Sequence, residues 1–222
     1  MLRKTSLETG NVYHIFSKSI AGFKIFTRER NFLRIFDAVK YYQIENPPLS
    51  FSHFIRVDKS SKGVHLRKIS NYPGNKQDKI VDIIAYCFMP THIHLVLRQL
   101  KDSGISIFMS KVLNSYARYF NTLYKRKGPL WEGPFQNVLV ESDEQLYHLT
   151  RYIHLNPVTA CLVDKPEDWI FSSYREYLSI SKEKICQYDD LFEIFPEEYK
   201  EFVEERKIEQ RELAMLKKLM LD

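Results

Sequence analysis

The sequence predicts an α+β fold, with an antiparallel sheet, helices packed on one face of it, and a helical extension at the C-terminal end. Two observations predict the sheet and its helices: short runs typical of strands occur among longer runs with helical spacing, and the strand-like runs at 81–89 and 92–99 are joined only by Pro90 and Thr91. A change to charge-rich sequence after about residue 178 predicts the extension.

The first part of the chain contains two predicted strands and one predicted helix. Residues 12–18 alternate loosely between apolar and polar side chains and are typical of a strand. Thr27 is a suitable N-cap for a helix that ends at Asn46-Pro47-Pro48. Residues 49–57 are predicted to form a second strand. Residues 58–79 are polar and basic, which indicates a long loop or a protruding ribbon.

The second part continues with further strands and helices. Residues 81–89 are almost entirely apolar, as expected of a central strand. A helix is predicted at 105–124 and a strand at 135–141. Ser142, with Gln145 three residues later, forms a capping box for a helix that should end near Asn156, because Pro157 follows. The order β-α-β-β-α-β within this series predicts a ferredoxin-like sheet.

Two domains are expected, a catalytic domain at 1–178 and a helical C-terminal extension at 179–222. Residues 197–222 combine many charges with leucines at helical spacing and predict an amphipathic helix. A solvated helix docked on the body of the protein, or on another chain, accounts for that pattern.

Composition narrows the class of protein. The chain has 222 residues, of which 44% are hydrophobic and 27% charged, and no apolar run is long enough for a membrane span. No signal peptide is evident, and Cys87, Cys161 and Cys186 are widely spaced, so we expect reduced thiols in a cytoplasmic protein. The net charge of +5 combines +9 in residues 1–80 with −4 in residues 181–222. A basic N-terminal part is compatible with a polyanionic partner.

A pair of histidines is the strongest local signal for chemistry. His92 and His94 are two residues apart on a predicted strand and therefore project from the same face. Two converging neutral imidazoles are suited to a divalent transition metal. The pattern equally fits two half-buried histidines that hydrogen-bond to the backbone.

A tyrosine and an asparagine on the helix at 143–156 can join this pair. Tyr152 and Asn156 are four residues apart and lie on one helical face. The amide oxygen of Asn156 can complete a site of two imidazoles and one amide, with positions left open for phosphate and water. Asn156 also fits a plain helix C-cap before proline, and Tyr152 is one of 14 tyrosines.

Together these residue types fit phosphodiester chemistry. A neutral tyrosine hydroxyl is a weak nucleophile, and the anionic oxygens of a phosphodiester repel attack. A metal beside the phosphate neutralises that charge and aligns it with the attacking oxygen. The resulting phosphotyrosine link conserves the bond, so that a free hydroxyl can later reseal the strand.

Basic residues are candidates for DNA contact because they bind phosphates, and exposed aromatic rings stack on bases. For Tyr116, Tyr119 and Phe120 we favour a place in the core over base stacking. The candidate DNA-binding residues lie in the 58–79 segment and along the helix at 105–125: Lys59, Lys62, Arg67, Lys68, Lys111, Arg118, Lys125 and Arg126.

Four motifs, in order, resemble those of a known family. They are Met89-Pro90-Thr91-His92-Ile93-His94, the segment Gly128–Phe135, the run Arg151-Tyr152-Ile153-His154-Leu155-Asn156-Pro157-Val158, and Trp169-Ile170-Phe171-Ser172-Ser173-Tyr174. This arrangement, covering about residues 10–178, resembles the single-tyrosine HUH transposases. It is most similar to the branch associated with repetitive extragenic palindromes (REP).

The resemblance implies a ferredoxin-like fold and a role for each motif residue. His92 and His94 match the metal-binding histidines, Tyr152 the nucleophile, and Asn156 the helix amide ligand, where other branches have glutamine. It also implies Mg²⁺ or Mn²⁺, recognition of hairpins in single-stranded DNA, and a 5′-phosphotyrosine intermediate with a free 3′-hydroxyl. Members act as monomers or homodimers.

Two other functions remain open from the sequence. One is a domesticated protein that binds DNA hairpins or acts as a repressor without catalysis. The other is an unrelated metal-dependent hydrolase that uses an activated water, which would retain activity after Tyr152→Phe and would form no covalent adduct.

Overall fold

The computed structural model describes residues 6–60 and 79–207, without the side chains of 57–60. The predicted DNA-binding residues Lys62, Arg67 and Lys68 lie outside the described residues, as do positions 208–222 of the predicted C-terminal helix. The elements are β1 (Val12–Lys18), η1 (Ile20–Gly22), α1 (Glu29–Tyr41), α2 (Phe51–Ser60), β2 (Val81–Met89), β3 (His92–Gln99), α4 (Gly104–Leu123), β4 (Gln136–Leu139), α5 (Asp143–Thr159), η3 (Pro166–Asp168), α6 (Tyr174–Tyr177) and α7 (Pro196–Glu204).

The four strands form one antiparallel sheet in the order β2-β3-β1-β4. Helix α1 connects β1 to β2, and α4 connects β3 to β4. This is the order and connectivity of a ferredoxin-like sheet, so the predicted fold class is confirmed. The strand predicted at 92–99 is found with those bounds, and the helix predicted at 105–124 is α4.

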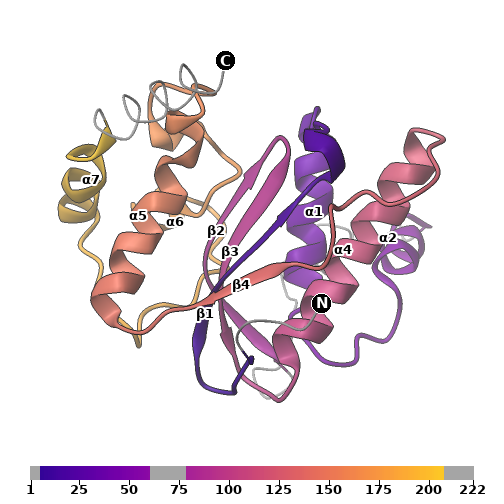
Figure 1. Ribbon diagram of the computed structural model, residues 1–222, viewed down its shortest axis with the longest axis horizontal. Coiled ribbons are helices and arrows are strands. Elements are labelled where there is room, and N and C mark those ends of the chain that lie inside the picture. The colour runs from indigo at the N-terminus through magenta and orange to yellow at the C-terminus, as the bar shows by residue number, and fades with distance from the viewer. Residues whose placement is uncertain (1–5, 61–78, 208–222) are drawn as a thin grey trace.

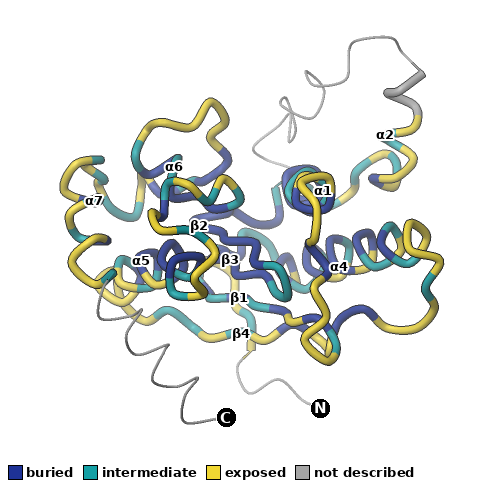
Figure 2. Tube along the Cα trace, turned by 90° about the horizontal axis from the view of Figure 1, so that it is seen from above, coloured by how far each residue is buried: buried dark blue, intermediate teal, exposed yellow. Residues whose placement is uncertain are grey.

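Helices cover both faces of this sheet (Figure 1). Helices α1 and α4 pack together on one face, as predicted, while α5 lies over the other, with α7 outside it and α6 beside β2. Side chains alternate between these faces, so that Tyr13 and Ile15 of β1 are fully buried on the α1 and α4 side. Figure 2 shows β2 and β3 as the buried centre between the two groups of helices, whereas β4 is more exposed.

Residues 49–57, predicted as a strand, are instead largely helix α2. Phe51, Phe54 and Ile55 face the core at helical spacing, and the Phe51 ring lies 5.3 Å from the Tyr41 ring. The Ser50 hydroxyl accepts a hydrogen bond from the His53 N–H at 3.4 Å, which caps the helix start. Packing against α1 therefore outweighs the strand-like composition of the segment.

β2, predicted as a central strand, is an edge strand of the four-stranded sheet. It is nevertheless buried along its whole length. Backbone groups of the chain after α5 (residues 160–207, here called the C-terminal part) pair with it. The N–H of Phe88 donates to the carbonyl of Phe171 at 3.0 Å, and the N–H of Gln187 donates to the carbonyl of Ile83 at 2.8 Å. A covered edge does not present its unpaired groups to other chains.

Several predicted boundaries shift. Helix α1 is capped by Arg28 rather than Thr27, and β4 is shorter than the predicted 135–141. Helix α5 continues through Pro157 and is capped by Ala160, so the prediction that Asn156 ends the helix is wrong. Pro157 is tolerated there because less than one turn follows, closed by a hydrogen bond from the Leu162 N–H to the Pro157 carbonyl at 2.9 Å.

The start of α5 carries the predicted N-cap, with one difference. The Ser142 hydroxyl accepts from the Gln145 N–H at 3.1 Å. The Gln145 side chain, however, accepts from the N–H of Glu141 at 2.7 Å, one residue before the cap. The cap fixes the first turn of the helix that carries Tyr152.

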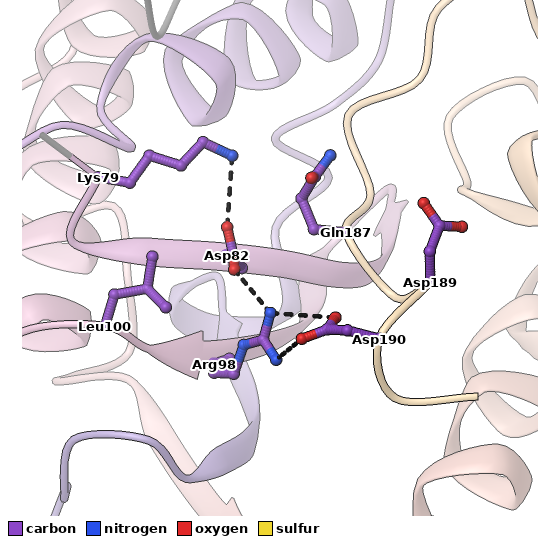
Figure 3. A pocket seen from close by; sticks show the side chains of 7 residues that line it. All are labelled: Lys79, Asp82, Arg98, Leu100, Gln187, Asp189 and Asp190. Carbon is purple, nitrogen blue, oxygen red and sulfur yellow. Dashed lines mark hydrogen bonds and ion pairs between the residues drawn. The ribbon is translucent and has the colours of Figure 1, made fainter. Parts of the chain in front are cut away.

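An ion-pair network ties the C-terminal part to the sheet (Figure 3). Arg98 of β3 binds Asp82 of β2 at 2.9 Å and Asp190 of the C-terminal part at 2.6 Å, while Lys79 binds Asp82 at 3.3 Å. Tyr199 and other residues of the C-terminal part lie in the same core as the sheet.

The three cysteines are free thiols, with Cys87 and Cys186 buried. The two buried thiols fill space in the core. Within the described part of the chain, no helix is long and apolar enough to cross a membrane.

Candidate active site

The two motif histidines lie on β3, an interior strand of the sheet, and share one face as predicted. Their ring centroids are 4.9 Å apart. Ile93 and Leu95 point to the opposite face and are fully buried. The alternation of the strand therefore separates a polar pair facing α5 from an apolar set facing α1 and α4.

A third imidazole joins them, which the sequence reasoning missed. β1 pairs with β3 in a register that places Phe16 opposite His94 and His14 opposite Val96. The Nε2 atom of His14 lies 2.9 Å from Nδ1 of His94, and the two rings stack at 5.1 Å. The alternating pattern at 12–18 puts His14 on one face, but only the pairing of β1 with β3 brings it to His94.

Hydrogen bonds leave one ring nitrogen of each motif histidine available. Nδ1 of His92 lies 2.9 Å from the Thr91 hydroxyl, and Nδ1 of His94 faces His14. Nε2 of both motif rings has no hydrogen-bond partner among the described residues. Such a second partner fixes the orientation of a histidine that binds a metal through its other nitrogen.

Burial keeps these imidazoles neutral at pH 7. It lowers the pKa of His14 to about 4. Burial, helped by the charge of Lys18, lowers the pKa of His92 to about 4. The pKa of His94 falls well below 6.5 because of burial first and then the neighbouring His92, His14 and Lys18. A neutral imidazole is the form that binds metals.

Tyr152 of α5 faces this cluster. Its ring centroid lies 6.0 Å from that of His94 and 6.5 Å from that of His14, nearly perpendicular to both. Its side chain is 45% exposed, so its hydroxyl is accessible to a substrate. Tyr147, another tyrosine of the same helix, packs instead against Phe202 of α7, with ring centroids 4.3 Å apart.

Asn156 lies one turn beyond Tyr152 and is half-buried. Its Nδ2 donates to the backbone carbonyl of Tyr152 at 2.9 Å. Its Oδ1 has no hydrogen-bond partner within the described part of the chain. The amide nitrogen is thus used within the helix, while the oxygen, the atom suited to a cation, is not.

Buried hydrogen bonds hold α5 in place over the sheet. The ring of His154 lies between the Ser173 hydroxyl, 2.7 Å from Nε2, and the Tyr199 hydroxyl, 2.6 Å from Nδ1. Ser173 in turn accepts from the Tyr86 N–H of β2 at 2.9 Å. His154 of the Arg151–Val158 motif and Ser173 of the Trp169–Tyr174 motif therefore serve to position the helix of Tyr152, which lies two residues before His154.

The Gly128–Phe135 motif is a loop that lines one side of a cavity next to β1. It is anchored by Trp131, whose Nε1 donates to the Leu113 carbonyl at 3.1 Å, and by the Glu132 N–H, which donates to the Lys18 carbonyl at 2.9 Å. The cavity between this loop and β1 has a volume of about 370 Å³. Lys18 lines it and pairs across the strands with His92. Sequence reasoning missed Lys18 because only the strand pairing places it there.

The predicted DNA-binding residues have different environments. Lys111 is half-buried and donates to the Glu45 carbonyl, and Arg126 donates to Asn121 at 3.1 Å and so braces its own loop. Arg118 and Lys125 are exposed. Lys59 lies in α2, with its side chain outside the described set. Tyr116 and Phe120 are buried and Tyr119 is half-buried, as expected of core residues.

Metal binding can be judged from the donor set. No cluster of three or more His, Cys, Asp or Glu side chains among the described residues is arranged as a complete metal site. The neutral, oriented imidazoles of His92 and His94 fit a divalent cation, which would need further oxygen ligands.

A ferredoxin-like sheet with a histidine pair on an interior strand and an exposed tyrosine facing it is the arrangement expected of the single-tyrosine HUH class. Comparisons with known proteins agree. The family model described as "Transposase IS200 like" matches residues 49–156. A Haemophilus influenzae protein described as a REP-associated tyrosine transposase is 26% identical over 129 residues, which span 53% of this chain and 66% of that protein.

A solved structure of a REP-associated tyrosine transposase bound to a REP hairpin has the same fold. The match has a TM-score of 0.53 at 14% identity and covers 87% of this chain and 94% of that one. The chain is therefore similar to the IS200-like transposases over residues 49–156, in agreement with the resemblance that its motifs predicted.

Proposed function

We propose that this protein cleaves and rejoins single-stranded DNA beside hairpins, with Tyr152 as the nucleophile and a divalent metal held by His92, His94 and Asn156. The observation that carries the proposal is the position of the exposed Tyr152 ring, 6.0 Å from the ring of His94. The similarity to IS200-like transposases and the hairpin in the related structure support DNA hairpins as the substrate class.

The strand-transfer step balances without net proton uptake. Tyr152 Oη attacks the phosphorus of a phosphodiester, and the bond between phosphorus and the 3′ oxygen breaks. The tyrosine loses its proton and the departing 3′ oxygen gains one. The product is a 5′-phosphotyrosine, from which a 3′-hydroxyl can displace the tyrosine in the reverse reaction.

The residues of the site divide this work. Neutral His92 and His94 offer their Nε2 atoms, and Asn156 offers Oδ1 from the helix of the nucleophile. A bound Mg²⁺ or Mn²⁺ would neutralise phosphate charge. Lys18, exposed at the end of β1 opposite His92, is positioned to attract a phosphate into the adjacent cavity.

The test uses labelled hairpin DNA with single-stranded flanks, with Mn²⁺, with Mg²⁺ or with a chelator. We expect cleavage and a covalent DNA–protein adduct only with metal, and loss of both in His92→Ala. Tight binding without cleavage would contradict the proposal and favour a hairpin-binding protein. Cleavage without an adduct would favour a nuclease that uses water.

A further inference from the structure

A second cluster of cations lies on the opposite face of the sheet from the histidines. A groove of about 510 Å³ runs between α1, α2 and α4, and each of these helices contributes one arginine: Arg34, Arg56 and Arg118. Figure 1 shows α2 beside α4 on that side of the molecule, away from α5. The other lining residues are polar or aromatic apart from one leucine: Tyr42, Ser50, Ser52, Ser115, Tyr119, Thr122 and Leu123.

The positive charge of the groove is not neutralised from within. None of the lining residues is acidic. Arg56 and Arg118 are exposed and form no ion pair with a described residue. Asp37, one turn along α1 from Arg34, attracts that guanidinium but makes no ion pair with it among the described contacts. Three cations thus share one cavity without a carboxylate.

Arg34 is held ready to bind. Its guanidinium lies 4.2 Å from the centre of the Phe51 ring and 5.2 Å from that of Tyr119, and one Nη donates to the Ser52 hydroxyl at 2.7 Å. Its Nε is buried and has no hydrogen-bond partner in the described structure. A partly desolvated guanidinium is more strongly stabilised by a neighbouring anion than one in bulk water.

The chemistry of the lining selects phosphate groups. The planar fork of arginine matches the oxygens of a phosphate, and serine and threonine hydroxyls donate to the same oxygens. The volume of about 510 Å³ is in the range of an organic ligand, well beyond a single small anion. Beyond the groove, the tip of α4 adds the exposed Lys125 and Lys127 and the 39% exposed Tyr124, so the basic surface extends past one phosphate.

We propose that this groove binds the sugar–phosphate backbone of the DNA substrate, at a site separate from the histidine–tyrosine centre. The proposal rests on the proposed function, since it assigns a second contact to the same DNA. A substrate held on both faces of the sheet must pass around its edge, so a hairpin with flanking strands would be gripped away from the scissile bond.

Arg56→Ala/Arg118→Ala tests the groove, because both side chains are exposed and their loss leaves the core intact. The control is Lys165→Ala/Lys182→Ala, which removes the same charge from exposed positions outside the groove. The affinity for a fluorescent hairpin with single-stranded flanks is measured by anisotropy at several salt concentrations. A second variant, Thr122→Glu, places a carboxylate in the groove without removing an arginine.

We expect the arginine variant to bind about tenfold more weakly. The slope of log K against log[salt] should become less negative by roughly 1.4, the value for two phosphate contacts to a single strand. Thr122→Glu should also weaken binding, and the lysine control should match the wild type. Equal affinity and slope in all variants would contradict DNA binding by the groove but would not affect the proposed function. Absence of DNA binding by the wild type would overturn both.

Discussion

His14 Nε2 lies 2.9 Å from His94 Nδ1, although 80 residues separate the two histidines in the sequence. Because both rings are neutral, one of the facing nitrogens carries the shared hydrogen. If Nδ1 of His94 donates it, Nε2 of His94 has its lone pair free for a cation. A neighbour that fixes the tautomer in this way also fixes the ring orientation. His14 is therefore a positioning residue in this account.

Replacing His14 should weaken metal binding before any DNA is present. We expect His14→Phe to lower the affinity for Mn²⁺ by about 10- to 100-fold, because His94 loses its orienting partner. Titration calorimetry on the metal-free protein measures this. His53→Phe, a change at an exposed histidine of α2, is the control and should bind Mn²⁺ like the wild type. An unchanged affinity in His14→Phe would mean that the pair has no role in the metal site.

Acid should destabilise the fold through His154. Burial lowers the pKa of His154 to about 3, below the value of about 6.5 expected in an unfolded chain. The unfolded state therefore takes up more protons as the pH falls from 6.5 toward 3, and the stability present above pH 6.5 is progressively lost. Between pH 7 and pH 5 this one histidine should lower the free energy of unfolding by about 2 kcal/mol.

Urea unfolding at the two pH values checks this effect, with His154→Asn as the comparison. The variant should lose about 2 kcal/mol less than the wild type between pH 7 and pH 5, whatever its stability at pH 7. Equal pH dependence in the two proteins would show that His154 is protonated in the folded state.

The ion pair between Arg98 and Asp190 should anchor the C-terminal part. Asp190→Asn removes a two-contact pair with a guanidinium that is only 17% exposed, and we expect a loss of about 0.5–1 kcal/mol. The matched control is Asp189→Asn, which breaks a pair with the 51% exposed Lys184 and should cost less. Hydrogen exchange at the Gln187 N–H reports the same anchoring locally, and faster exchange only in the control would refute it.

The sequence predicts the parts of the fold that depend on local patterns. Strand 92–99 follows from alternation and α4 from helical spacing, and His92 and His94 share a face because the period of a strand is two. The strand predicted at 49–57 is wrong, because contacts of Phe51 with α1 favour a helix and a local pattern does not reveal them. Burial of β2 likewise follows from residues near 171 and 187, which no local window contains.

The residues of the candidate site likewise fall into those that the sequence predicts and those that only the fold reveals. Motif resemblance finds Tyr152, His92, His94 and Asn156, whereas His14 and Lys18 enter only through the register of β1 against β3. The role of His154 also requires the fold, because its partners Ser173 and Tyr199 lie 19 and 45 residues further along the chain.

The central claim, that Tyr152 becomes covalently joined to DNA, is tested by mapping the adduct. Wild-type protein is reacted with hairpin DNA and Mn²⁺, digested with nuclease and protease, and examined by mass spectrometry, with Tyr152→Phe and Tyr147→Phe in parallel. We predict a nucleotide joined through phosphate to Tyr152 in the wild type and in Tyr147→Phe, and none in Tyr152→Phe, which should still bind the hairpin. An adduct that persists in Tyr152→Phe, or that maps to another residue, would contradict the account.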